Sequence, residues 1–356
     1  MKIVDETKLD FDDILLVPAR SPAASRKEVE LKRTFKFFHS TKEWTGLPIM
    51  AANMDTTGSF KMGTALNKHD AVTCLHKHYD AETIDEYFAY YNIERHVWIS
   101  VGMGDHELDR LLKIKSLIHH SPNICIDIAN GYTEKFVEWC SKIRHYFNDS
   151  IIMAGNVCTP EMVQELILHG GVDIVKIGIG PGSACTTRLK TGVGYPQLSA
   201  IIECSHAAHG LKNGERRMGL ICADGGCRIP ADVCKAFAAN ADFVMLGGML
   251  AGTHECEGDW EYEIDDDGEY QKSHLSFYGM SSEKAQKKYN GGMSSYASSE
   301  GRIKIIPYKG FADSVMNDIE GGLRSCCAYV GATSLKDLPK CAKAVKVNRV
   351  HFDGSV

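Results

Sequence analysis

The sequence lacks the patterns that identify several large classes of protein. It contains 13 cysteines, yet it has no Cys-x-x-Cys pair and no Cys/His spacing of the kind found in zinc sites. It has no apolar run approaching the roughly 18 residues needed to cross a bilayer, and no segment resembling a signal peptide. Acidic residues outnumber basic ones by 46 to 40, so a basic surface for nucleic acid is not expected. We therefore expect a reducing, cytoplasmic environment, with neither a membrane nor nucleic acid as a partner.

What the sequence does contain is a series of eight short apolar runs, most of them about 20–30 residues apart. These runs are almost continuously apolar rather than alternating, which is typical of parallel strands covered on both faces. The segments between them have helical spacing, as in Thr159–Leu168, where Thr-Pro begins the pattern. The runs are Leu47–Ala52, Ala71–Leu75, Val97–Val101, Ile124–Ile128, Ile151–Ala154, Val172–Ile177, Gly219–Ala223 and Phe243–Leu246.

This repeat predicts a (β/α)8 TIM barrel, in a chain whose 356 residues suit a single catalytic domain spanning residues 1–356. An open doubly wound sheet is the structural alternative. No Gly-x-Gly-x-x-Gly loop opens the first unit, which counts against a Rossmann domain. Residues 253–310 interrupt the repeat with an acidic stretch and a Gly/Ser-rich stretch, so we expect a mobile flap inserted after the eighth strand, with the acidic stretch as a solvated hairpin or part of the flap. Residues 312–330 then resume helical spacing.

Polar or glycine clusters end nearly every apolar run. In a barrel of this kind, the loops after the strands meet at one rim and carry the chemistry. Any one cluster alone is more simply explained as a turn, but eight in register predict a functional rim. The clusters are Asn53–Asp55, His76–His78, Gly102–Gly104, Asp127 with Asn130–Gly131, Gly155–Asn156, Gly178–Arg188, Asp224–Gly226 and Gly247–Gly248.

The loop Gly178–Arg188 is the most informative of these clusters, because it delivers Cys185 from a glycine-rich turn beside two threonines and an arginine. A thiol in such a loop can ionise and act as a nucleophile, while the neighbouring Thr187 hydroxyl passes protons. Glu300, in the Gly/Ser-rich stretch, is a candidate acid or base. The alternative interpretations are a buried cysteine in a turn and a solvated surface carboxylate.

Two further clusters predict a phosphate site. The glycines of Asp224–Gly226 and Gly247–Gly248 allow amide groups to approach phosphate oxygens, and Asp224 could accept hydrogen bonds from a ribose. This pattern favours a nucleoside monophosphate or flavin mononucleotide, the alternative being a pair of tight turns. Carbonyl groups of Gly180, Gly182 and Cys185 could surround a monovalent cation, whereas no side-chain set resembles a transition-metal site.

Five segments of the chain together resemble the IMP dehydrogenase/GMP reductase family, and the similarity covers roughly residues 8–350. The reductase branch of that family is the closer match, because residues 76–96 leave no room for an inserted regulatory domain. Lys77 and the Ser-Glu-Gly at Glu300 also match the reductases. The segments are Leu9–Pro18, Gly178–Arg188, Asp224–Gly226, Val244–Gly248 and Tyr278–Ser281.

The resemblance implies NADPH-dependent reductive deamination of GMP to IMP in purine salvage, with ammonia released through a Cys185 thioimidate and with Thr187 and Glu300 as proton-transfer groups. It implies a homotetramer and a potassium site on carbonyls of Gly180, Gly182, Cys185 and Arg188. The implied GMP-binding residues are Asp224, Gly225, Gly226, Gly247, Gly248, Gly279, Met280 and Ser281. The implied cofactor-binding residues are Ser25, Arg26, Lys77, Asp127, Ile128, Ala129, Gly180, Gly321, Gly322, Leu323 and Arg324.

One departure from the family pattern is Ala297, which follows Tyr296 where relatives commonly have arginine. We hypothesise that Arg302 replaces the charge of that arginine. Three other functions remain open: IMP dehydrogenase activity, an FMN-dependent barrel enzyme, and a nucleotide sensor without turnover. The residue patterns also leave open NADPH against NADH, the oligomeric state, allosteric nucleotides and the acceptance of xanthosine monophosphate.

Overall fold

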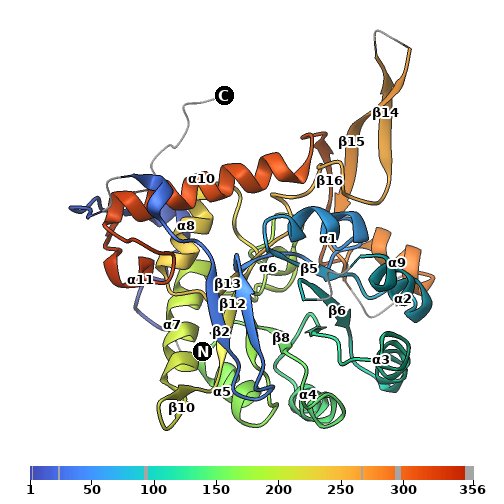
Figure 1. The fold of residues 1–356 in the computed structure, drawn as a ribbon, viewed down its shortest axis with the longest axis horizontal. Helices are drawn as coiled ribbons and strands as arrows, with labels where there is room; N and C mark the ends of the chain where they lie inside the picture. The colour runs from blue at the N-terminus through green and yellow to red at the C-terminus, as the bar shows by residue number, and fades with distance from the viewer. Residues whose placement is uncertain (2, 23–24, 92–94, 266–267, 293–297, 349–356) are drawn as a thin grey trace.

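The computed structural model describes residues 1–356 apart from 2, 23–24, 92–94, 266–267, 293–297 and 349–356. Eight parallel strands form a closed barrel, so the predicted architecture is confirmed (Figure 1). Each of the eight apolar runs overlaps one barrel strand. The strands are β4 (Ile49–Ala51), β5 (Val72–Leu75), β6 (Val97–Val101), β7 (Ile124–Asp127), β8 (Ile152–Val157), β9 (Ile174–Ile177), β12 (Leu220–Asp224) and β13 (Phe243–Leu246).

Helices follow almost every strand and lie around the outside of the barrel (Figure 1). The longer helices bury an apolar stripe in the core; in α10, the stripe contains Met316, Ile319, Leu323 and Cys327, all fully buried. The helices are α1 (Phe60–Asn67), α2 (Ala81–Tyr90), α3 (Asp105–Ile118), α4 (Glu134–Tyr146), α5 (Pro160–Leu168), the short α6 (Thr187–Thr191), α7 (Gln197–Gly210), α8 (Pro230–Ala238), α10 (Ala312–Val330) and α11 (Leu338–Cys341).

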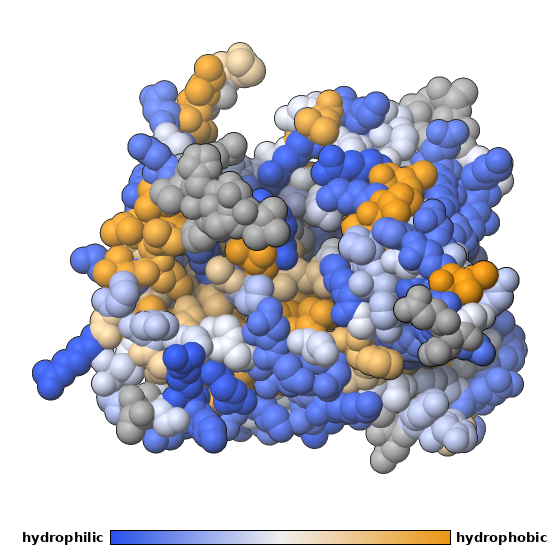
Figure 2. All heavy atoms as spheres, turned by 90° about the horizontal axis from the view of Figure 1, so that it is seen from above, coloured by the Kyte–Doolittle hydropathy of each residue, from blue (hydrophilic) through white to orange (hydrophobic). Residues whose placement is uncertain are grey.

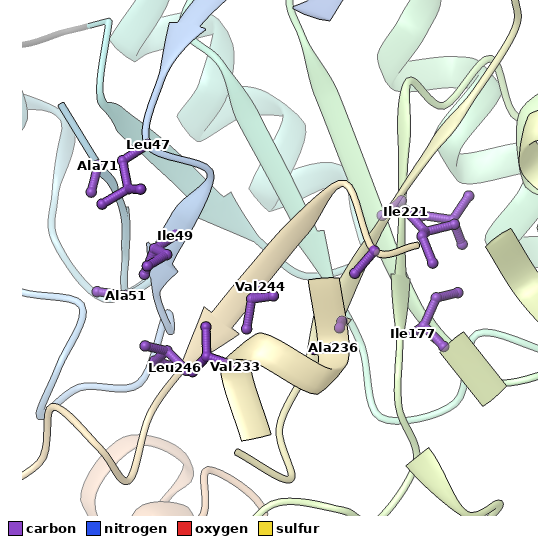
Figure 3. Packing of buried hydrophobic residues seen from close by; sticks show 14 of the residues in the cluster. Leu47, Ile49, Ala51, Ala71, Ile177, Ile221, Val233, Ala236, Val244 and Leu246 are labelled. Carbon is purple, nitrogen blue, oxygen red and sulfur yellow. The ribbon is translucent and has the colours of Figure 1, made fainter. Parts of the chain in front are cut away.

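The core has two layers because successive residues of each strand point to opposite faces. Ile49 and Ala51 of β4 face outward into the layer between strands and helices, whereas Met50 faces the barrel interior. Figure 3 shows part of the outer layer, where Val233 of α8 lies near Leu246 of β13. The barrel is therefore filled by side chains rather than open along its axis.

Smaller elements cover the ends of the barrel. The hairpin of β2 (Arg33–Lys36) and β3 (Glu43–Gly46) places Phe35 and Trp44 in the inner core cluster. The N-terminal part has the 3-10 helices η1 (Phe11–Asp13) and η2 (Arg26–Glu28). The remaining pairs are β1 (Ile14–Leu16) with β17 (Ala344–Lys346) and β10 (Lys212–Asn213) with β11 (Arg216–Arg217).

Residues 253–310, here called the flap, contain regular structure. The strands β14 (Trp260–Ile264), β15 (Tyr270–Tyr278) and β16 (Ile303–Pro307) form an antiparallel sheet, and α9 (Glu283–Asn290) lies between β15 and β16 in the chain. The β14–β15 hairpin projects from the body of the molecule in Figure 1. The acidic stretch thus forms part of a hairpin, which is one of the two forms expected for it.

The surface seen from above the view of Figure 1 is largely hydrophilic, with hydrophobic side chains in several separate groups (Figure 2). Within the described residues, no helix is both long enough and apolar enough to span a bilayer.

Candidate active site

A cavity of about 840 Å³ lies at the carboxyl ends of the barrel strands. Its lining comes from the strand-end clusters that the sequence predicted, together with the flap residues Gly279–Ser281 and Glu300. The rim position is that expected for the site of a TIM barrel, and the volume suits a nucleotide with part of a second ligand.

The three predicted catalytic residues come together in this cavity. The Sγ atom of Cys185 lies 3.2 Å from Oγ1 of Thr187, and that hydroxyl donates a 2.7 Å hydrogen bond to Oε2 of Glu300. Cys185 is half-buried and lines the cavity, so a ligand can reach its thiol. The arrangement joins a thiol, a hydroxyl and a carboxylate by two successive contacts, a set that could act as a nucleophile with a proton relay.

Backbone geometry explains why the Cys185 loop is rich in glycine. Gly178 and Gly180 have φ values of 147° and 80°, which residues with a side chain rarely adopt. A Cβ atom at Gly178 would also lie only 2.3 Å from the carbonyl oxygen of Asp224. The loop therefore turns tightly against the end of β12, which brings Cys185 to the strand ends.

Main-chain contacts fix Glu300 against the same loop. Residues Cys185 and Gly301 form an antiparallel bridge, and the amide of Thr186 donates a 2.7 Å hydrogen bond to the carbonyl of Glu300. The amide of Arg302 donates to the carbonyl of Ala184 at 2.9 Å. The position of the Glu300 carboxylate is thus set by backbone pairing as well as by Thr187.

All eight predicted substrate-binding residues line the cavity. Asp224 ends β12, where Nδ2 of Asn156 donates a 2.8 Å hydrogen bond to its Oδ2 atom. Gly225 and Gly226 follow with φ values of 83° and 89°, and a Cβ atom at Gly248 would lie 2.9 Å from Oγ of Ser183. This part of the rim allows a phosphate to approach main-chain amides closely.

Lys176 is a site residue that the sequence reasoning missed. This buried lysine of β9 lines the cavity, and its Nζ atom lies 2.7 Å from Asp127 and 3.0 Å from Asp224. Burial alone would lower the pKa of Lys176, but the two carboxylates raise it well above its usual value. For Asp127, burial acts to raise the pKa, but the charge of Lys176 outweighs burial. The pKa of Asp127 therefore falls below its usual value. The available signal was a lysine within an otherwise apolar parallel strand.

The structure separates the predicted cofactor-binding residues into two groups. The first group lines the cavity and consists of Lys77, Asp127, Ile128, Ala129 and Gly180. The second group lies at η2 and α10, outside the described cavity lining, and consists of Ser25, Arg26, Gly321, Gly322, Leu323 and Arg324.

The second group makes contacts of its own. The guanidinium of Arg26 donates a 2.9 Å hydrogen bond to Ser325, and that of Arg324 donates a 2.6 Å bond to the carbonyl of Val29. The Leu323 side chain is fully buried in the core, so it has no free surface for a ligand in this chain. A cofactor role for this group stays a prediction.

The predicted cation site consists of main-chain carbonyls. The carbonyl of Gly182 accepts a 3.0 Å hydrogen bond from the amide of Cys185, and that of Arg188 accepts a 3.1 Å bond from Gly192. Because each carbonyl has two lone pairs, both can still bind a hard monovalent ion, so the donor set fits potassium. Within the described residues, no three His, Cys, Asp or Glu side chains are grouped to hold a metal ion.

Arg302, which we suggested as a replacement for the missing arginine, lies in the wall of the cavity. Its Nε atom donates a 2.9 Å hydrogen bond to the carbonyl of Ser183, and its side chain lines the cavity together with Lys304. Tyr296 and Ala297 lie outside the described residues.

Comparison with known proteins agrees with this geometry. Residues 8–355 match the model of the IMP dehydrogenase / GMP reductase domain. The chain is 50% identical over 349 residues to the GMP reductase of Yersinia enterocolitica (serotype O:8 / biotype 1B), a match covering 98% of this chain and 97% of that protein. The GMP reductase of Yersinia pestis (strain Pestoides F) has the same identity and coverage.

Among solved structures, inosine 5′-monophosphate dehydrogenase from Legionella pneumophila superimposes with a TM-score of 0.78. It is 35% identical, and the match covers 96% of this chain and 99% of that one. The family model spans nearly the whole chain, and the fold, the nucleophile loop and the full-length relatives agree with it. This chain belongs to the IMP dehydrogenase/GMP reductase family.

Proposed function

We propose that this protein is a GMP reductase, which converts GMP to IMP and ammonia at the expense of NADPH. The observation that carries the proposal is the line of contacts from Cys185 through Thr187 to Glu300 at a cavity with glycine-rich phosphate loops. The 50% identity to full-length proteins named GMP reductase supports the same reaction.

The chain's own residues provide the binding of GMP. The phosphate lies against the amides of Gly225–Gly226 and Gly247–Gly248, while the Asp224 carboxylate accepts hydrogen bonds from the ribose hydroxyls. The Nζ atom of Lys176 lies 3.0 Å from Oδ2 of Asp224, so a cation stands beside the carboxylate that accepts these hydrogen bonds. This fixes the base over Cys185, because both ends of the nucleoside are held at the rim.

Covalent capture then makes the purine reactive. The Cys185 thiolate forms a bond to C2 of the guanine, and the C2–N bond breaks as the amino group leaves as ammonia. Thr187 and Glu300 transfer the protons that this leaving group needs. NADPH supplies the hydride that arrives at C2, after which the C2–S bond breaks and IMP is released. Lys77 and Asp127 line the part of the cavity in which we place the nicotinamide.

Three further assignments belong to this proposal. Potassium binds to carbonyls of Gly180, Gly182, Cys185 and Arg188, whose hard oxygen donors suit it. The protein acts as a homotetramer, and it acts in the cytoplasm as part of purine salvage.

The test is to incubate the purified protein with GMP and NADPH in a reducing potassium buffer. Loss of nicotinamide absorbance with an equal release of ammonia would establish the reaction. If IMP instead drives the reduction of NAD, the protein is a dehydrogenase. A yellow preparation would indicate a flavin enzyme, and GMP binding without turnover would indicate a sensor.

A further inference from the structure

Asp55 binds three donors from the flap, although it lies in the loop after β4. Its Oδ2 atom accepts hydrogen bonds from the hydroxyls of Tyr278 and Tyr289, each at 2.7 Å, and from Nζ of Lys288 at 2.9 Å. The side chain of Asp55 is 1% exposed. Burial acts to raise its pKa, but these three donors outweigh burial and hold the pKa below its usual value. All described hydrogen-bond partners of the Asp55 side chain thus belong to the flap, and one of them, Lys288, carries the opposite charge.

These three donors flank the flap turn that lines the cavity. Tyr278 ends β15 directly before Gly279–Ser281, and Lys288 and Tyr289 belong to the last turn of α9. An isolated helix of eight residues is marginal in water, so α9 needs an attachment of this kind to keep its position. Asp55 thus holds both sides of a turn that we assign to substrate binding.

The Gly279–Ser281 turn also contacts the segment that carries Glu300. The amide of Glu300 donates to the carbonyl of Ser281 at 3.3 Å, and that of Glu283 donates to Oγ of Ser299 at 3.2 Å. A Cβ atom at Gly301 would lie 2.9 Å from Ser282, the residue that caps α9, so the two backbones are in close contact. A shift of α9 would therefore displace Glu300 from Thr187.

On its other side, α9 contacts the loop after β5. The ring of Tyr289 stacks on that of His78 with centroids 3.4 Å apart and planes 2° from parallel. Both residues line the cavity, next to Lys77. Burial lowers the pKa of His78 to about 4, so the ring is neutral at pH 7 and stacks without carrying a charge. The attachment at Asp55 thus also holds the wall beside the cofactor half of the cavity.

We propose that Asp55 is a positioning residue that fixes α9 and the Gly279–Ser281 turn over the cavity, so that Glu300 stands at Thr187 and Tyr289 at His78. The part that concerns Glu300 rests on the proposed function. The attachment itself is independent of that function, because it is made entirely by groups of this chain.

A second ion pair on the same helix provides the control. Nζ of Lys284 lies 2.7 Å from Asp259, whose side chain is 70% exposed. Exposed pairs contribute little because water screens them. The Asp259→Asn variant removes a carboxylate that pairs with Lys284 of the same helix, and it leaves Asp55 untouched.

The experiment compares Asp55→Asn with Asp259→Asn by hydrogen exchange of residues 283–290 in the ligand-free protein, followed by steady-state kinetics. We expect exchange in Asp55→Asn to be faster by about tenfold or more, because the neutral amide cannot accept three donors. We expect kcat to fall by at least about tenfold with a smaller change in the KM for GMP, because Glu300 loses its alignment. Asp259→Asn should match the wild type in both measurements.

Unchanged exchange in Asp55→Asn would overturn the proposal, whether or not the wild type turns over GMP. Absence of turnover in the wild type would instead overturn the proposed function. The hydrogen-exchange comparison would then still decide whether Asp55 fixes α9. If Asp55→Asn does not fold, Lys288→Met and Tyr289→Phe remove single donors, and Tyr289→Phe keeps the ring that stacks on His78. Wild-type exchange and kcat in both variants would also refute the role of Asp55.

Discussion

The hydroxyl of Thr187 donates a 2.7 Å hydrogen bond to the carboxylate of Glu300, although the two residues are 113 positions apart in the chain. Thr187 begins α6, which follows the loop after the barrel strand β9, whereas Glu300 belongs to the flap that follows the last barrel strand. The proposed chemistry therefore depends on two parts of the chain that meet only at the mouth of the barrel.

Replacing the nucleophile should separate binding from turnover. We expect Cys185→Ala to lower kcat by more than about a thousandfold while GMP still binds, because the covalent step is lost and the phosphate loops are not. Nicotinamide absorbance measures turnover, and calorimetry measures binding. Cys227→Ala is the matched control, since Cys227 is a second half-buried thiol in the cavity lining and burial raises its pKa well above the usual value. Full activity in Cys185→Ala would contradict covalent catalysis.

Thr187 and Glu300 should act as one unit. We expect Thr187→Val and Glu300→Gln each to lower kcat by about 10²–10⁴-fold, which is typical for a lost proton-transfer group. The double variant should be no slower than the worse single variant, because either change already breaks the relay. Multiplicative losses in a double-mutant cycle would show that the two residues act separately.

Lys176 should be important for stability as well as for binding. We expect Lys176→Met to lower the free energy of unfolding by about 3–5 kcal/mol, because Asp127 and Asp224 would then be left near each other without their shared cation. Urea denaturation provides the measurement. Lys36→Met removes an exposed ion pair to Glu43 and should change the value by less than about 0.5 kcal/mol. A loss below about 1 kcal/mol in Lys176→Met would contradict the role of Lys176 as a buried counter-ion.

His76 should make stability depend on pH below neutrality. Burial lowers the pKa of this histidine from 6.5 to about 4, and its neutral Nδ1 atom accepts a hydrogen bond from the amide of His78. Between these two values the unfolded chain binds more protons, so the free energy of unfolding should rise with pH from 4 to 6.5. We expect His76→Gln to have a smaller slope in this window in denaturation at several pH values. An identical slope would show that His76 does not contribute.

Arg302 should compensate for the alanine at position 297. We expect Arg302→Ala to raise the KM for GMP or for NADPH by about tenfold, because a cation would be lost from the cavity lining beside Ser183. Arg302→Lys keeps the charge and should retain most of the affinity. Unchanged Michaelis constants in Arg302→Ala would reject the compensation.

The strands of the barrel could be predicted because their signal is local. Each is a short apolar run, and a parallel strand buried on both faces needs no more specific pattern than that. The pairing of β1 with β17 could not be predicted, since it joins Ile14 to Lys346 and depends on the tertiary structure of the whole chain. A solvated hairpin was one of two forms expected for the acidic stretch of the flap, but its strand bounds could not be given, because β14 is mostly exposed and lacks an apolar face.

The candidate site divides in the same way. The glycine-rich loop itself pointed to Cys185 and Thr187 as candidates, whereas the family resemblance was needed to favour Glu300 over a solvated carboxylate. The sequence marked Lys176 only as part of an apolar strand, and it marked Asp55 only as part of a cluster at the rim. Their roles depend on partners as far away as Tyr289, 234 positions from Asp55, and no local pattern carries such information.

The pairing of β13 with β4 has a consequence for the folding of the chain. Val244 pairs with Ile49, so the strand that begins the barrel has no neighbour on that side until the last strand has been made. Contacts between residues so distant in sequence form slowly, because a long loop must be closed before they stabilise anything. Asn53 and Gly247, which follow these two strands, both line the cavity. Nucleotide binding should therefore appear late in refolding, with closure of the barrel rather than with formation of the helices.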